Sequence, residues 1–165
     1  MLLTFILALS GCVLLFLMIL AATITMPFSA LVKNFPVDVQ RRLQFRINTM
    51  PMSPKRIFGR IILILLMLAW AGLFVAGGID GRANGFSYWQ FVLRFLIIAA
   101  AVKVFDIVCL DYFLLTKTHF FQHFFPETEG CKGWQQFGYN WKTHLAHVIA
   151  FVFISALLAW VCTLI

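Results

Sequence analysis

Four stretches of apolar residues, each long enough to cross a lipid bilayer as a helix, occupy most of this sequence. They run from Leu2 to Met26, from Ile61 to Ile79, from Trp89 to Leu115 and from Thr143 to Ile165. A helix rises about 1.5 Å per residue, so about 20 residues cover a hydrocarbon core about 30 Å thick. With 62% hydrophobic and 12% charged residues, the chain has more apolar surface than a water-soluble fold of this size can bury. We therefore predict an all-α integral membrane protein with four transmembrane helices.

The segments between these stretches are too short for a further globular domain. We expect residues 1–165 to form a single four-helix transmembrane domain. The first stretch is expected to be a span rather than a cleavable signal, because no basic segment precedes it. Gly72 and Ala76 form a small-xxx-small pair that would let a neighbouring helix approach closely. A homo-oligomer and a complex with a membrane partner subunit are both open alternatives to a monomer.

Lysine and arginine are distributed unevenly among the connecting segments. Seven basic residues lie between the first two stretches and three between the last two, whereas the turn between the middle two contains only Arg82. Because short basic loops stay in the cytoplasm, we predict cytoplasmic loops at 33–60 and 117–142 and both termini outside. The net charge of +7 belongs largely to these membrane flanks, which favours membrane lipid over nucleic acid as the partner.

The first of these basic loops combines helical spacing with positive charge. Its apolar residues recur every three or four positions, at Val39, Leu43, Ile47 and Met50. Its arginines fall between them, at Arg41, Arg42 and Arg46. This pattern predicts an interfacial amphipathic helix in the first cytoplasmic loop. A solvated basic connector is one alternative, and a specific site for anionic lipid or a protein partner is another.

The third apolar stretch is unusual because it carries four charged residues. Lys103 lies about 21 Å beyond Trp89 along an ideal helix, well inside the hydrocarbon layer, and Asp106 shares its helix face. Such a pair either fixes helix packing or forms a substrate, ion or proton site. Lys103 and Asp106 are therefore candidates for substrate binding, or for an ion or proton pathway in a transporter helper subunit. Arg94, nearer the outer surface, is expected to reach toward the head groups.

All four histidines of the chain lie between His119, just after the third stretch, and His147, near the start of the fourth. His119 and His123 are four residues apart, and His144 and His147 are three apart, so each pair shares a face if its segment is helical. Imidazole with a nearby carboxylate suits zinc or another transition metal. These four histidines are our candidate metal ligands, with zinc as the candidate cofactor.

The same segment can form a polar pocket without a metal, because imidazole exchanges protons near neutral pH and a carboxylate can orient it. The candidate catalytic residues are Asp111, His119, His123, Glu127 and Glu129. The candidate substrate-binding residues, besides Lys103 and Asp106, are Tyr112, Lys117, Phe120, Phe124 and Trp134. A polar head would meet the first group, and a lipid or isoprenoid chain would lie among the phenylalanines. Ordinary interfacial packing of these side chains is the remaining alternative.

Several functions lack the residues that they need. The sequence contains no Walker A, GxGxxG, GxSxG, HExxH or paired CxxC motif, which argues against nucleotide hydrolysis, dinucleotide binding and common hydrolase chemistry. The expected function is therefore that of a small membrane protein whose cytoplasm-proximal pocket of histidines and carboxylates binds or acts on an amphiphilic substrate. Whether it is an enzyme is left open by the sequence.

Overall fold

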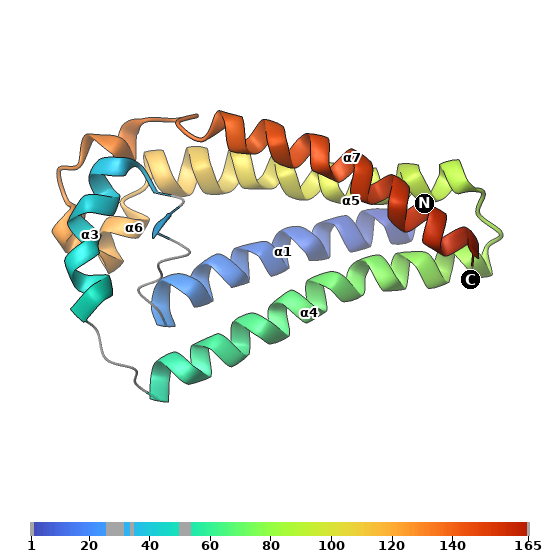
Figure 1. Cartoon of the computed structure of the whole chain (residues 1–165), viewed down its shortest axis with the longest axis horizontal. Coiled ribbons are helices and arrows are strands. Elements are labelled where there is room, and N and C mark those ends of the chain that lie inside the picture. The colour runs from blue at the N-terminus through green and yellow to red at the C-terminus, as the bar shows by residue number, and fades with distance from the viewer. Residues whose placement is uncertain (1, 26–31, 34, 50–53, 165) are drawn as a thin grey trace. The chain divides into compact units, whose positions relative to one another are not determined.

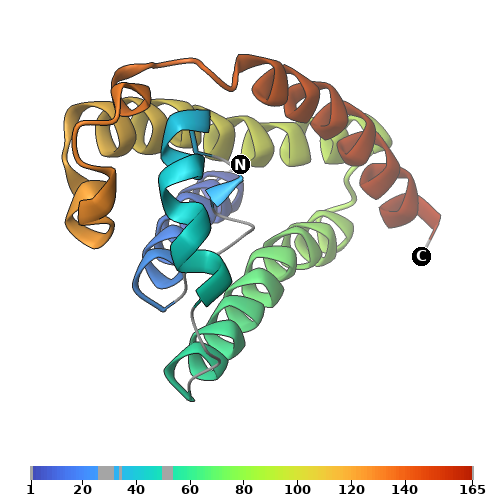
Figure 2. The ribbon, with the colours of Figure 1, turned by 60° about the vertical axis from the view of Figure 1, so that its left-hand side comes forward.

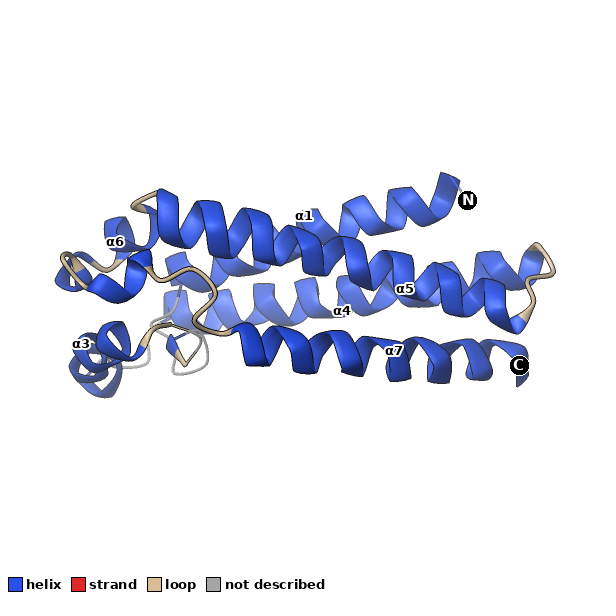
Figure 3. Ribbon diagram, turned by 90° about the horizontal axis from the view of Figure 1, so that it is seen from above, coloured by secondary structure: helices blue, strands red, loops and turns tan. Residues whose placement is uncertain are grey.

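The computed structural model describes residues 2–25, 32–33, 35–49 and 54–164 (Figure 1). Within this part of the chain all regular structure is helical, as Figure 3 shows, so the all-α prediction is confirmed there. The long helices are α1 (Leu2–Thr25), α4 (Pro54–Ala83), α5 (Tyr88–Phe105) and α7 (Trp141–Leu164). The shorter ones are α3 (Val37–Thr49), the π-helix η1 (Asp106–Lys117), α6 (Phe120–Phe124) and the 3₁₀ turns η2 (Pro126–Thr128) and η3 (Lys132–Gln135).

Three of these helices are long and apolar enough to cross a membrane, over Leu2–Thr23, Ile57–Ala83 and Trp141–Leu164. They correspond to the first, second and fourth predicted stretches, and they identify a membrane protein. The third stretch is also helical, but it is not among these three. Its α-helix has 18 residues, contains Arg94 and Lys103, and continues directly into η1.

The chain packs as two compact units, each with its own core. Unit 1 comprises Met1–Leu15, Met67–Asp106 and Trp141–Ile165, and unit 2 comprises Phe16–Leu66 and Ile107–Asn140. In unit 1, α5 and α7 lie side by side (Figures 1 and 3). Phe91 and Phe95 of α5 pack there against Ala159 of α7, and Ile98 packs against Leu7 of α1. Helix α5 thus forms the centre of unit 1.

Arg94 is buried inside unit 1 and does not reach toward the head groups. Its side chain is 2% exposed, and Nη1 donates to the carbonyl oxygen of Gly77 at 2.6 Å and pairs with Asp80 at 2.7 Å. The guanidinium also lies over the ring of Phe86, 4.2 Å from its centroid. The expectation from sequence was wrong because a partner on α4, which periodicity alone does not reveal, satisfies the charge within the protein.

Two glycines of α4 lie in close contact with α5. A Cβ added to Gly81 would collide with the ring of Phe91, and one added to Gly77 would lie 3.5 Å from side-chain atoms of Arg94 and Phe95. At Gly72 a Cβ would meet no atom of the described residues within 4 Å. The close approach therefore occurs at Gly77 and Gly81, and in the described part of the chain no helix lies against Gly72 of the predicted small-residue pair.

Unit 2 has an aromatic core. Phe35 makes edge-on contacts with Phe121, Phe125 and Trp134, at ring-centroid distances of 5.0, 6.1 and 5.0 Å. Trp134 in turn stacks on Phe121 at 5.6 Å. Such aromatic pairs add stability beyond the area that they bury. The segment that follows η1 is consequently a packed structure with its own core.

Helix α3, which is cyan to teal at the centre of Figure 2, contributes one face to this core. Val39 and Leu43 are 0% and 1% exposed, whereas Arg41 and Arg42 are exposed. The predicted apolar stripe therefore packs on protein in its first two positions. Its other two members, the side chain of Ile47 and residue Met50, lie outside the described part of the chain, as does the side chain of Arg46.

The docking of α3 depends on Asp38 and Gly133. Asp38 accepts hydrogen bonds from the backbone N–H of Val39 and from that of Gly133, each at 2.9 Å. A Cβ on Gly133 would collide with the Asp38 carboxylate and with Pro36. Glycine at this position thus lets η3 approach the start of α3 closely enough for the carboxylate to join them.

Candidate functional site

A polar cavity of about 580 Å³ lies in unit 2 between the end of η1 and the loop that follows α6. Tyr112, Thr116 and Lys117 come from η1, and Gln122 comes from α6. The opposite wall comes from the chain around η3, which turns at Gly130 with a φ of +79°. The full lining is Tyr112, Thr116, Lys117, Thr118, His119, Gln122, Gly130, Cys131, Lys132, Trp134, Gln135 and Phe137.

The charged side chains on this lining are all basic. Lys117 and Lys132 both contribute to the wall, and His119 adds an imidazole that can also become positive. None of the four described carboxylate residues of unit 2, which are Asp38, Asp111, Glu127 and Glu129, contributes to it. A cavity with this charge distribution attracts anions such as phosphate or carboxylate.

The aromatic side chains of the wall are held by their own contacts. The Trp134 indole N–H donates to the hydroxyl of Thr128 at 3.1 Å and points away from solvent. Tyr112 packs edge-on against Phe137 at 5.5 Å, and the Lys117 ammonium lies 5.3 Å from the Tyr112 ring centroid. Aromatic faces beside cationic groups give the cavity an amphipathic character.

Four of the predicted site residues therefore come together, namely Tyr112, Lys117, His119 and Trp134. Other predicted catalytic residues lie elsewhere in unit 2. Asn140 donates to Asp111 at 3.4 Å, His123 packs edge-on against Phe124, and Glu129 is exposed. The backbone carbonyl of Glu127 accepts a hydrogen bond from Arg42 at 3.3 Å. Phe120 and Phe124 pack against the aromatic core.

Eight of the twelve lining residues were not predicted from the sequence, among them Gln122, Lys132 and Phe137. The buried Oε1 of Gln122 has no hydrogen-bond partner among the described residues. Lys132 follows Cys131, the end of the segment in which the histidines and glutamates gather, so a search for cations beside that segment could have found it. Phe137 carries no comparable signal, because its role depends on the packing of two loops.

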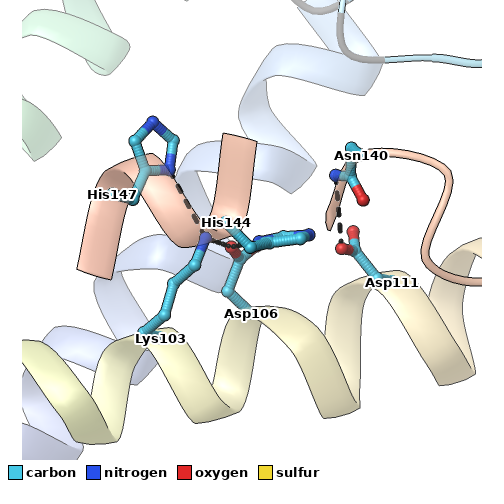
Figure 4. A network of polar contacts seen from close by, with 6 residues as sticks. All are labelled: Lys103, Asp106, Asp111, Asn140, His144 and His147. Atoms are coloured by element: carbon cyan, nitrogen blue, oxygen red, sulfur yellow. Dashed lines mark hydrogen bonds and ion pairs between the residues drawn. The ribbon is translucent and has the colours of Figure 1, made fainter. Parts of the chain in front are cut away.

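A second polar group lies in unit 1, where α5 meets the start of α7 (Figure 4). Lys103 is 6% exposed, and its Nζ donates to Asp106 Oδ2 at 2.7 Å, so the predicted ion pair is present. Two histidines of α7 extend it. Lys103 Nζ lies 3.4 Å from Nδ1 of His147, and His144 Nδ1 lies 3.8 Å from the same oxygen of Asp106.

The geometry of this network assigns roles to its atoms. A lysine ammonium has donors only, so Nδ1 of His147 must accept and its proton must lie on Nε2. The carboxylate of Asp106 faces both Lys103 and His144, and it compensates the buried ammonium. Figure 4 shows the four side chains converging between the two helices. The arrangement can hold and redistribute protons, because two of its members are imidazoles.

The histidine pairs thus lie in different surroundings, with His144 and His147 in unit 1 and His119 and His123 in unit 2. Among the described residues, no three His, Cys, Asp or Glu side chains gather in a way that could hold a metal ion. The zinc site remains a prediction from sequence.

No family model, curated protein or solved structure matches the chain, so comparison with known proteins identifies no relative.

Proposed function

We propose that the chain crosses the bilayer four times, with Tyr88–Lys117 as the third crossing. Helix α5 begins five residues after the end of α4 and packs along α7. Its two neighbours α4 and α7 are both apolar enough to cross the bilayer. The buried charges Arg94 and Lys103 have partners within unit 1, which lowers the cost of placing them in hydrocarbon. Both termini are then outside, segments 33–60 and 117–142 are cytoplasmic, and α3 presents its exposed arginines to the inner leaflet.

We further propose that the cavity of unit 2 binds the head group of an amphiphilic, lipid- or isoprenoid-like molecule. The observation that carries this proposal is the cavity of about 580 Å³, whose lining combines basic and aromatic residues. Lys117 and Lys132 would bind an anionic head, and Tyr112, Trp134 and Phe137 would contact its first apolar groups. If the bound molecule is also turned over, His119 is the group on this lining best suited to move a proton.

Binding of a short-chain alkyl phosphate to the purified full chain tests this proposal. The double variant Lys117→Gln, Lys132→Gln should weaken binding of the phosphate by about tenfold or more, since each charge-assisted hydrogen bond contributes roughly 1.5–3 kcal/mol. Lys33→Gln is the matched control, because Lys33 is an exposed lysine of the same unit that does not line the cavity. Equal affinity of the double variant and the wild type would refute the head-group site.

A second candidate function is a proton pathway through Lys103, Asp106, His144 and His147. It rests on the convergence of two imidazoles on a buried ion pair, a composition common in intramembrane proton relays. Reconstituted vesicles containing a pH-sensitive dye would measure it. The double variant Lys103→Met, Asp106→Leu should reduce flux to that of protein-free vesicles, and His123→Ala in unit 2 should not change it. Wild-type flux no greater than that of empty vesicles would exclude this function.

A further inference from the structure

An apolar groove lies among α4, α5 and α7 of unit 1. Its volume is about 800 Å³, which is in the range of small-molecule sites. Phe95 and Ala99 of α5 lie between a wall from α4 and a wall from α7. The lining is apolar apart from Arg82, Ser155 and the polar atoms of Trp70 and Cys162.

The groove is as long as one leaflet of a bilayer is deep. On α4 it extends from Trp70 to Arg82, which is about 18 Å at 1.5 Å per residue. On α7 it extends from Phe151 to Cys162, or about 17 Å. Half of a hydrocarbon core about 30 Å thick is about 15 Å. A single extended acyl chain therefore fits the groove from the surface to the bilayer centre.

The charge of the groove lies at one end. Arg82 is in the last turn of α4 and is exposed, and among the described residues its side chain has no hydrogen-bonded or ionic partner. The nearby carboxylate of Asp80 is already paired with Arg94 at 2.7 Å. The positive charge of Arg82 is consequently uncompensated at the point where the helix leaves the hydrocarbon.

We propose that this groove binds one acyl chain of an anionic phospholipid, with Arg82 bound to the phosphate of its head group. The proposal requires that α4 and α7 cross the bilayer, and it does not depend on the cavity at Lys117. Arginine binds phosphate through two parallel N–H donors, and the apolar walls match the chemistry of the acyl chain.

A helix from a second copy fits the same surface less well. The groove covers about 17 Å of α7, whereas the whole helix of 24 residues is about 36 Å long. A partner helix would need contacts along most of that length, and it would leave Arg82 without an anion. The combination of a cation at the surface and an apolar groove of one-leaflet depth fits a lipid.

Photo-crosslinking of the full chain in vesicles tests the proposal. The probe is phosphatidylglycerol with a photoreactive group near the end of one acyl chain, compared with phosphatidylcholine carrying the same chain. We expect adducts at the deep end of the groove, near Trp70 and Phe151, and stronger labelling by phosphatidylglycerol. Arg82→Gln should lower that labelling by about tenfold, toward the phosphatidylcholine level. Arg60→Gln, at an exposed position on the same helix, should leave it unchanged.

A second pair of variants tests the groove itself. Ala71→Phe fills it and should reduce labelling by both lipids, whereas Ala76→Phe, at an exposed alanine of α4 outside the lining, should not. The double variant Lys117→Gln, Lys132→Gln should be labelled as strongly as the wild type. This result would show that the labelled site is distinct from the cavity of unit 2. Unchanged labelling in Arg82→Gln, or adducts spread evenly over the exposed faces of α4 and α7, would each overturn the proposal.

Discussion

The two buried cations of α5 differ in how their partners are encoded. Lys103 pairs with Asp106, three residues further along the same helix, so helical spacing reveals the pair. Arg94 pairs with Asp80 and the carbonyl oxygen of Gly77 on a different helix. In both cases a carboxylate and hydrogen bonds offset the loss of hydration that burial imposes on a charge. These pairs let a highly apolar bundle retain charged residues.

Replacing Arg94 with methionine should destabilise the protein. The substitution keeps most of the side-chain volume but removes the partner of Asp80 and the donor to Gly77, which should lower the free energy of unfolding by about 3 kcal/mol. Arg94→Lys should be intermediate, because an ammonium cannot reproduce the planar fork of a guanidinium. Thermal unfolding in detergent would measure both variants, with Arg60→Met as the exposed control. Equal midpoints for Arg94→Met and the wild type would contradict a stabilising role for the contacts of Arg94 with Asp80 and Gly77.

At the scale of elements, α4 presents two different faces. Gly77 and Gly81 face α5 so closely that a side chain at Gly81 would meet the ring of Phe91. Most of the large apolar side chains of α4 are instead exposed, including Leu65, Leu68 and Val75. For a helix in lipid this exposure carries no cost, and only the small residues mark where another helix lies against it.

Alanine substitutions at two glycines of α4 should therefore have opposite effects. Gly81→Ala forces a methyl group against Phe91 and should cost roughly 1–3 kcal/mol of stability. Gly72→Ala meets no neighbour and should be neutral or stabilising by up to about 1 kcal/mol, since alanine favours the helix. Thermal unfolding of both variants, measured side by side, checks this. Equal destabilisation by the two would mean that helix α4 is not packed through Gly81.

The helix that follows α5 changes its periodicity. From Asp106 to Lys117 it is a π-helix, and Thr118 continues the pattern by donating its N–H to the carbonyl oxygen of Phe113, five residues back. Extended π-helical geometry is rare and is often found at functional sites. Faces assigned at 3.6 residues per turn do not apply to this segment, which carries Tyr112 and Lys117 into the cavity of unit 2.

For the whole molecule, the number of crossings determines which surface each site faces. With four crossings, the turn after α4 and the loop containing η2 lie on opposite sides of the membrane. With three, in which Tyr88–Lys117 does not cross, they lie on the same side. With the N-terminus outside, the cavity of unit 2 would face the cytoplasm only in the first arrangement.

Cysteine labelling in intact cells distinguishes these topologies. In a variant without the four native cysteines, Ala83→Cys should react with a membrane-impermeant maleimide from outside. Glu129→Cys should react only after the membrane is permeabilised, because the basic loop 117–142 is predicted to be cytoplasmic. Both positions are exposed in the structure, so accessibility depends on the side of the membrane. Labelling of both from the same side would reject four crossings.

The sequence by itself was sufficient to identify a helical membrane protein, because long apolar stretches have few other stable forms in lipid. It also identified the Lys103–Asp106 pair and four of the residues that line the cavity of unit 2. The membrane helices follow from composition, and the other features involve residues that are close together in the chain.

Only the tertiary structure brought Asp80 to Arg94, Gly133 to Asp38, and His144 and His147 to the ion pair of α5. Each of these contacts joins residues on different elements. Their positions depend on which helix faces approach, and a nearly uniform apolar surface in a membrane helix gives no periodic signal for that choice. Small residues and buried charges decide it, and their partners become visible only once the helices are packed.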